Sequence, residues 1–131
     1  MPEPRLSLLI PVYNNEPTLA ALAERIARSL DGWTFEVILV NDGSRDGSLE
    51  VLKGLAARDQ RFKVISFSRN FGQHAATLAG MTSAQGDWVV TMDEDGQHDP
   101  AFIGPMIDRA YADHAQLVYA SPTNPPPHGA F

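Results

Sequence analysis

Segment 93–99 holds the side chains best suited to chemistry. It places four acidic residues within seven positions, directly after the apolar run Trp88–Met92. If that run is a strand, Asp93 and Asp95 project to the same face, because side chains two apart in extended backbone share a face. Two carboxylates with the amide oxygen of Gln97 in reach are the hard oxygen ligands that Mg²⁺ and Mn²⁺ prefer. The alternative is a solvated acidic loop, since Asp and Gly are ordinary turn residues.

Two more polar groups also follow apolar runs. Asp42 comes after the second run, and its carboxylate could accept hydrogen bonds from a nucleotide base. Equally, Asp42 could cap a turn in which Gly43 supplies unusual backbone angles. Pro11 and Tyr13 end the first run and could pack against a base or a ribose, because tyrosine combines an apolar face with a polar tip. A lone tyrosine at the start of a loop more often packs internally, so this pair alone is a weak signal.

The segment Asn70-Phe71-Gly72 precedes an expected helix. Its backbone N–H groups could approach a phosphate, as helix N-termini do. Alternatively, Gly72 serves only as the loop residue that such a connection needs. The four histidines are scattered singly and none is assigned a catalytic role, although His98 lies inside the acidic segment.

The elements that must position these residues alternate along the chain. Short apolar runs predict strands over Leu6–Pro11, Phe35–Val40, Phe62–Phe67, Trp88–Met92 and Leu117–Ala120. Helical spacing predicts helices over 17–30, from a cap at Asp46 or Ser48, over 73–83, and from Pro100 with Phe102, Ile103, Met106, Ile107 and Ala110 on one face. This alternation predicts an α/β fold with a mostly parallel sheet, helices on both faces and right-handed crossovers. All the polar groups would then meet at the carboxyl ends of the strands.

Composition limits the remaining possibilities. A chain of 131 residues with 44% hydrophobic residues fits one domain, expected over 1–120, followed by a proline-rich tail or linker over 121–131. The net charge of −6 and the lack of a basic stripe disfavour nucleic acid as a partner. The absence of cysteine excludes disulfides, zinc–thiolate sites and thiol nucleophiles. The sequence has no long apolar run or signal-peptide pattern, which predicts a cytoplasmic chain.

Several common motifs are missing from the sequence. There is no Gly-x-Gly-x-x-Gly after the first strand, no Gly-x-x-x-x-Gly-Lys-Ser/Thr and no Gly-x-Ser-x-Gly. These absences disfavour a dinucleotide-binding dehydrogenase, a P-loop NTPase and a serine hydrolase.

Taken together, four segments resemble the family 2 glycosyltransferases with the GT-A fold. They are Ile10-Pro11-Val12-Tyr13-Asn14-Asn15-Glu16, Val40-Asn41-Asp42-Gly43-Ser44-Arg45-Asp46-Gly47-Ser48, Ser68-Arg69-Asn70-Phe71-Gly72-Gln73 and Met92-Asp93-Glu94-Asp95-Gly96-Gln97. The resemblance runs from about Leu6 to Leu117, with the motifs in family order. The last segment resembles the Asp-x-Asp motif. Its Gln97 resembles the motif of the family branch that uses dolichyl or polyprenyl phosphate acceptors.

The resemblance implies a Rossmann-like nucleotide-sugar-binding domain and an inverting transfer with Mg²⁺ or Mn²⁺. By position, it implies that the base and ribose are held by Pro11, Tyr13 and Asp42, with Glu16, Asn70 and Gly72 as further donor contacts. Asp93 would lie near the ribose or sugar, and Asp95 and Gln97 would lie near the metal and the diphosphate. The implied partners are a nucleotide-diphosphate sugar donor and a polyprenyl phosphate or glycan acceptor.

The resemblance also implies that the catalytic base lies beyond residue 131, together with any membrane segments. Glu94 and Asp99 are the only nearby candidates for that base, and neither matches the family position. We therefore expect residues 1–131 to be the donor-binding part of a longer enzyme at the cytoplasmic face of a membrane. The alternative is a non-catalytic nucleotide-binding module. A nucleotidyltransferase is disfavoured, because it would be expected to carry a Gly- and Arg-rich first loop, whereas the first loop here is Tyr13-Asn14-Asn15-Glu16. An open sheet edge makes a homodimer a further prediction.

Overall fold

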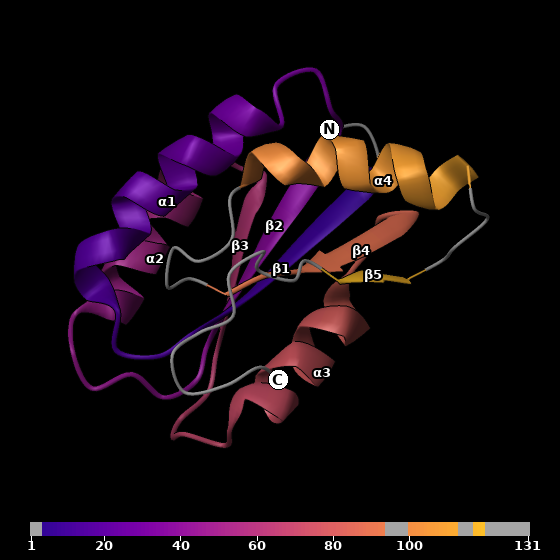
Figure 1. Cartoon of the computed structure of the whole chain (residues 1–131). Helices are drawn as coiled ribbons and strands as arrows, with labels where there is room; N and C mark the ends of the chain where they lie inside the picture. Colours follow the sequence, from indigo (N-terminus) through magenta and orange to yellow (C-terminus); the bar gives the residue numbers. More distant parts are fainter. Residues whose placement is uncertain (1–3, 94–99, 113–116, 120–131) are drawn as a thin grey trace, which may run out of the picture.

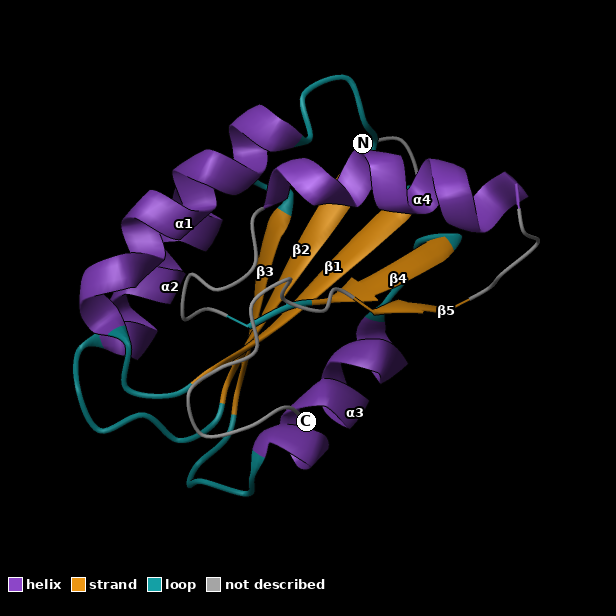
Figure 2. Cartoon of the chain, viewed as in Figure 1, coloured by secondary structure: helices purple, strands orange, loops and turns teal. Residues whose placement is uncertain are grey.

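The computed structural model describes residues 4–93, 100–112 and 117–119, which form one parallel sheet layered with helices (Figures 1 and 2). The elements are β1 (Leu6–Val12), α1 (Glu16–Ser29), β2 (Phe35–Asn41), α2 (Ser48–Arg58), β3 (Phe62–Ser66), α3 (Gln73–Ser83), β4 (Trp88–Thr91), the 3₁₀ turn η1 (Pro100–Phe102), α4 (Ile103–Ala112) and β5 (Leu117–Tyr119). The strand order is β3-β2-β1-β4-β5, and each neighbouring pair is parallel. The α/β class and the parallel sheet predicted from the sequence are confirmed.

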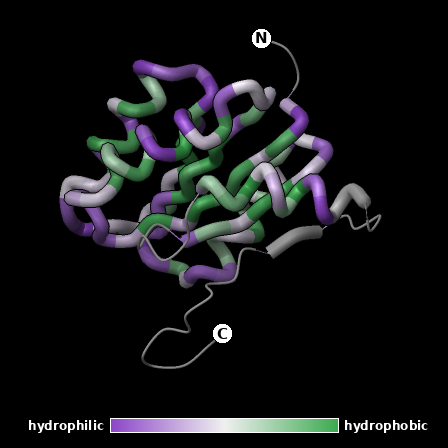
Figure 3. The backbone as a smooth tube through the Cα atoms, turned by 45° about the horizontal axis from the view of Figure 1, so that its top comes forward, coloured by the Kyte–Doolittle hydropathy of each residue, from purple (hydrophilic) through white to green (hydrophobic). Residues whose placement is uncertain are grey.

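The core lies along β1 and β2, the central strands of this sheet. All seven residues of β2 are buried, which explains its near-continuous apolar sequence, because a strand covered on both faces has no solvent side. In β1 the side chains alternate, so that Leu8 and Ile10 enter one core cluster and Leu9 enters the other. Figure 3 shows the hydrophobic stretches gathered along the strands and hydrophilic stretches in the surrounding turns.

Helix α1 is amphipathic and packs on the first of these two cores. Its buried side chains recur at helical spacing, at Leu19, Leu22, Ala23 and Ile26. Proline in the first turn leaves no hydrogen bond unmade, because the first N–H groups of a helix have no partner within it. The chain then turns at Gly32, whose φ of 89° is a conformation that glycine adopts more readily than other residues do.

Helix α3 covers the opposite face, whereas α1, α2 and α4 lie together on the first (Figure 1). It approaches the sheet closely because its inward residues, Ala76 and Gly80, are small. A Cβ at Gly80 would lie 2.7 Å from the Leu9 side chain, so a larger residue there would push the helix away. The prediction of helices on both faces is confirmed.

The connection through α4 differs from the other three. The chain moves from β3 to β4 in the opposite direction along the sheet from its β1-to-β2 step, and α3 accordingly crosses the opposite face. From β4 to β5 the direction is the same as for α3, yet α4 packs on the face of α1. This connection therefore has the opposite hand to the others, so the prediction of right-handed crossovers throughout is wrong.

The start of the last helix also differs from the prediction. The sequence predicted a helix from Pro100 with Phe102 on its buried face, but residues 100–102 form a 3₁₀ turn and Phe102 is 62% exposed. A 3₁₀ turn has three residues per turn, so it rotates Phe102 away from the face of Ile103 and Ile107. Those two side chains are buried as expected.

A break in the sheet lies beside the carboxyl end of β1. The β1–β4 ladder ends at the pair Leu9 and Thr91, whereas the β1–β2 ladder continues to Val12 and Asn41. The strand order reverses at this same place, because β1 leads to β2 on one side and neighbours β4 on the other. Such switch points are where open α/β sheets bind ligands, outside the carboxyl ends of the strands.

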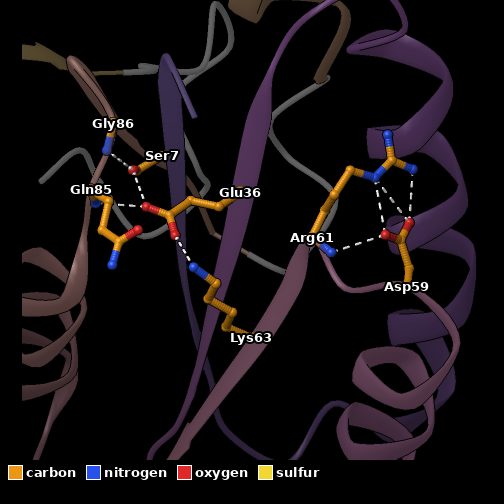
Figure 4. A network of polar contacts seen from close by, with 7 residues as sticks. All are labelled: Ser7, Glu36, Asp59, Arg61, Lys63, Gln85 and Gly86. Atoms are coloured by element: carbon orange, nitrogen blue, oxygen red, sulfur yellow. Dashed lines mark hydrogen bonds and ion pairs between the residues drawn. The ribbon is translucent and has the colours of Figure 1, made fainter. Parts of the chain in front are cut away.

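A buried polar cluster lies near the amino ends of the strands, on the α3 face (Figure 4). Glu36, fully buried, accepts hydrogen bonds from the Ser7 hydroxyl at 2.5 Å, from Lys63 Nζ at 2.7 Å and from the Gln85 N–H at 2.7 Å. Ser7 in turn accepts the N–H of Gly86 at 2.8 Å. These bonds join β1, β2 and β3 to the turn between α3 and β4, and the sequence analysis did not foresee them.

Candidate functional site: the carboxyl edge of the sheet

The loops that follow β1, β2, β3 and β4 meet at one edge, and hydrogen bonds join each of them to another. The β1 loop bonds to the β2 loop, and the β2 loop bonds to the β3 loop. The helix that follows the β3 loop then bonds to Asp93, which follows β4. The predicted convergence of the strand ends therefore holds for all the predicted site residues that the structure describes.

The loops after β1 and β2 interlock through their first polar residues. The Asn14 N–H donates to Ser44 Oγ at 3.0 Å, and Asn14 Oδ1 accepts the Arg45 N–H at 2.7 Å. Asn14 has a φ of 49°, a left-handed conformation that asparagine tolerates better than most residues. The polar residues at 14–16 and 44–48 are thus joined by hydrogen bonds, a role that the sequence analysis did not separate from ligand binding.

Glu16 takes part in the same interlocking. Its carboxylate Oε1 accepts the Gly47 N–H at 2.9 Å, and its own N–H donates to Asp46 Oδ2 at 3.2 Å. Hydrogen bonds from Ser48 lower the pKa of Asp46 below its usual value. Glu16 was predicted to contact the donor; in this structure its carboxylate is bonded to the β2–α2 loop.

Asp42 is the centre of the contact between the β2 and β3 loops. It is only 4% exposed, and Oδ1 accepts the Phe71 N–H at 2.7 Å. Oδ2 accepts the Gly72 N–H at 3.0 Å and the Asn70 amide at 3.2 Å. The sequence analysis considered the N–H of Gly72 as a contact for a phosphate. In this structure that N–H donates to Asp42. Each carboxylate oxygen has two lone pairs, so Oδ1 retains capacity for another donor.

Gly43 allows these two loops to approach. Its φ is 70°, and a Cβ there would lie 2.2 Å from the Arg69 carbonyl carbon and 2.3 Å from the Asn70 nitrogen. Backbone at that distance cannot give way without moving the loop. Glycine is therefore required at this position both for its conformation and for the close contact.

Pro11 and Tyr13 flank the switch point at the end of β1. Pro11 pairs with Val40 of β2 and lies beyond the last residue of β1 that pairs with β4. Proline is accommodated there because no neighbouring strand on the β4 side needs its missing N–H. Tyr13 is 42% exposed, and its packing against a base stays a prediction.

Asp93 is the one predicted metal ligand that the structure describes. It follows β4 at the switch point, is half-buried, and its Oδ1 accepts the Gln73 side-chain amide at 3.0 Å. The other candidates, Asp95 and Gln97, lie outside the described residues, as do Glu94, His98 and Asp99. Among residues 4–93, 100–112 and 117–119, no group of three acidic or histidine side chains could hold a metal.

Gln73 is a residue that the sequence analysis missed. It is the first residue of α3 and ends a segment already singled out, 68–73. A signal for Gln73 was available, because it lies in the polar segment that follows a strand. The sequence analysis chose only Asn70 and Gly72 from that segment as site residues.

The chain belongs to glycosyl transferase family 2, whose model matches residues 7–129. It is 47% identical over 109 residues to an undecaprenyl-phosphate 4-deoxy-4-formamido-L-arabinose transferase of Pseudomonas paraeruginosa. That match covers 80% of this chain and 32% of the relative, so the chain spans about a third of the length of this relative. The predicted membership of family 2, and the similarity to its polyprenyl-phosphate branch, are confirmed.

Solved structures share the fold. TarS 1–349 of S. aureus in complex with UDP-GlcNAc matches with a TM-score of 0.68 and 22% identity, over 84% of this chain and 32% of that one. A mannosyltransferase of Pyrobaculum calidifontis in complex with GDP-Man and Mn²⁺ matches with a TM-score of 0.64 and 24% identity, over 71% and 28% of the two chains. The predicted GT-A fold is confirmed. No helix in the described part of the chain is long and apolar enough to cross a membrane.

Proposed function

We propose that residues 1–131 are the donor-binding part of a metal-dependent inverting glycosyltransferase. The enzyme would move a sugar from a nucleotide-diphosphate donor to a polyprenyl phosphate or a glycan. The observation that carries this proposal is the joining of Asp42 and Asp93 at one edge of the sheet by segment 70–73. The Asp42 carboxylate would lie at the base end of the donor, and the Asp93 carboxylate would lie at its diphosphate end.

The base and ribose would lie over the switch point beside β1. Tyr13 is 42% exposed and Pro11 is partly buried, and both would pack against the base or the ribose. Asp42 Oδ1 keeps acceptor capacity for an N–H of the base. Glu16, Asn70 and Gly72 would support this end of the donor site through the loops that they fasten, in addition to any contact of their own with the donor.

The diphosphate would lie toward Asp93, with Asp95 and Gln97 completing the predicted ligand set. Carboxylate and amide oxygens suit Mg²⁺ or Mn²⁺, and Asp93 at the switch point is where such a set should begin. A cation bound there would neutralise the charge of the departing diphosphate. The base that deprotonates the acceptor is proposed to lie beyond residue 131.

Further parts of the proposal concern the whole protein. We propose one domain over 1–120 and a tail or linker over 121–131, and membrane association through segments outside this chain. The support for membrane association is the undecaprenyl phosphate in the name of a relative. A homodimer formed through a sheet edge such as β3 is a further proposal. Light scattering that finds only monomer would contradict it.

Calorimetric titration with UDP, GDP, CDP and dTDP, with and without Mn²⁺, tests the donor site. We expect one nucleotide to bind, with an affinity that needs Mn²⁺ and is lost in Asp95→Ala. Asp87→Ala is the matched control, because Asp87 is an exposed acid at the amino end of β4 and should leave binding unchanged. Binding that ignores both Mn²⁺ and Asp95 would favour the non-catalytic nucleotide-binding module instead.

A further inference from the structure

We infer that Gln73 is a positioning residue that orients Asp93 toward the diphosphate end of the donor. The inference rests on the proposed function, and its starting point is the 3.0 Å hydrogen bond from the Gln73 side-chain amide to Asp93 Oδ1. The two residues lie 20 positions apart in sequence, because Gln73 begins α3 whereas Asp93 follows β4. Gln73 is therefore a neighbour of Asp93 only because of the way the β3–α3 loop is held.

Asp42 holds that loop. Its carboxylate accepts the N–H groups of Phe71 and Gly72, the two residues that directly precede Gln73. Gly72 is the N-cap of α3 and has a φ of 101°, a conformation that favours glycine. Helix α3 therefore begins at a point fixed by Asp42, and its first side chain is directed at Asp93.

This arrangement has a chemical consequence for Asp93. A carboxylate that binds a cation keeps one orientation better when a second group bonds to it, and loss of such outer partners typically lowers metal affinity about 10- to 100-fold. Gln73 is suited to this role because its amide is neutral: it donates a hydrogen bond to Oδ1 without adding a charge that would compete with the cation. Gln73 thus tunes the metal-dependent part of donor binding and not the base contact.

The first test detects the contact in the protein without ligand. The Gln73 side-chain amide signals in a ¹⁵N-correlated NMR spectrum, assigned by their absence in Gln73→Met, should shift in Asp93→Asn. The signals of Gln85, which is exposed near the other end of α3, should stay in place. Unmoved Gln73 signals would overturn the inference whatever the protein binds.

The second test measures Mn²⁺-dependent affinity for whichever of UDP, GDP, CDP or dTDP the wild-type protein binds. Gln73→Met keeps the length of the side chain but cannot donate, and should weaken binding with Mn²⁺ about tenfold or more. The weak residual binding in the absence of Mn²⁺ should stay unchanged. Gln73→Lys restores a donor but adds the charge that competes with the cation, so it should recover none of the loss in Mn²⁺, and Gln85→Met should equal wild type.

Equal affinity of Gln73→Met and wild type in Mn²⁺ would overturn the positioning role while leaving the proposed function intact. Equal weakening with and without Mn²⁺ would also overturn it, since that pattern marks a general disturbance of the loop. If wild-type protein binds none of the four nucleotides in Mn²⁺, the proposed function fails, and the positioning role fails with it.

Discussion

The two ends of strand β2 each carry a buried carboxylate, and the two are held in different ways. Glu36 at the amino end is paired with a cation, Lys63, and with the Ser7 hydroxyl, both on neighbouring strands. Asp42 at the carboxyl end accepts only uncharged donors, the N–H groups and the amide of the β3–α3 loop. Within the described residues, no cation forms an ion pair with Asp42.

This difference separates a structural cluster from a candidate binding site. Burial by itself would raise the pKa of Glu36, but the hydrogen bonds from Lys63, Ser7 and Gln85, with the charge of Lys63, outweigh it and hold the pKa below its usual value. Its charge is compensated by groups in the rigid sheet. Asp42 is instead stabilised by loop dipoles and keeps capacity for one more donor, as a site for a ligand requires.

The largest effect on stability is expected from Glu36→Ala. The change leaves the Ser7 hydroxyl and the Gln85 N–H without their acceptor and Lys63 without its partner. Removing one member of a buried pair costs about 3–5 kcal/mol, and the half-exposed Lys63 places the expected loss near the lower value. Urea denaturation measures it. Glu50→Ala is the control, because that side chain is 79% exposed and its loss should stay within about 0.5 kcal/mol.

The next effect compares two glycines with positive φ. Gly43→Ala would place its Cβ against the backbone of Arg69 and Asn70, whereas Gly32→Ala would meet nothing within 4 Å. Both substitutions carry the strain of a left-handed residue, about 1 kcal/mol, but Gly43→Ala must also displace the β3–α3 loop. We expect the free energy of unfolding to fall further for Gly43→Ala, and nucleotide affinity to fall for it alone. Equal losses in the two variants would contradict the close contact of the loops.

A smaller effect is expected from pH. Because the pKa of Glu36 is lowered in the folded state, its contribution to stability is fully present above the pKa of an unfolded glutamate, about 4.3. That contribution is lost as the pH falls through the lower, folded pKa. The difference in unfolding free energy between wild type and Glu36→Gln should therefore be constant from pH 7 to about pH 5 and shrink below about pH 4. A difference that grows on acidification would show that the sign is wrong.

Local patterns in the sequence predicted most of the fold. Apolar runs located the strands to within one residue, and helical spacing located the helices, because buried strands and amphipathic helices repeat with known periods. The hand of the α4 connection and the exposure of Phe102 were not predicted. Both depend on how η1 packs against α1 and how α4 packs on the sheet, which no local period records.

The candidate site was predicted in position but not in detail. The strand-exit rule brought Tyr13, Asp42 and Asp93 to one edge, since parallel strands end on the same side of a sheet. Whether a polar loop residue bonds to a ligand or to another loop depends on distances between segments about 30 residues apart in sequence. For this reason the fastening roles of Glu16 and Gly72 were not foreseen.

The central claim is that the carboxyl edge binds a nucleotide and the Glu36 cluster serves only the fold. Nucleotide affinity in Mn²⁺, measured by calorimetry on folded Asp42→Ala and Glu36→Gln, tests it most directly. The account predicts a loss of about tenfold or more for Asp42→Ala, equal to about 1.4 kcal/mol, and affinity within about twofold of wild type for Glu36→Gln. Unchanged affinity in Asp42→Ala, or an equal loss in Glu36→Gln, would contradict it.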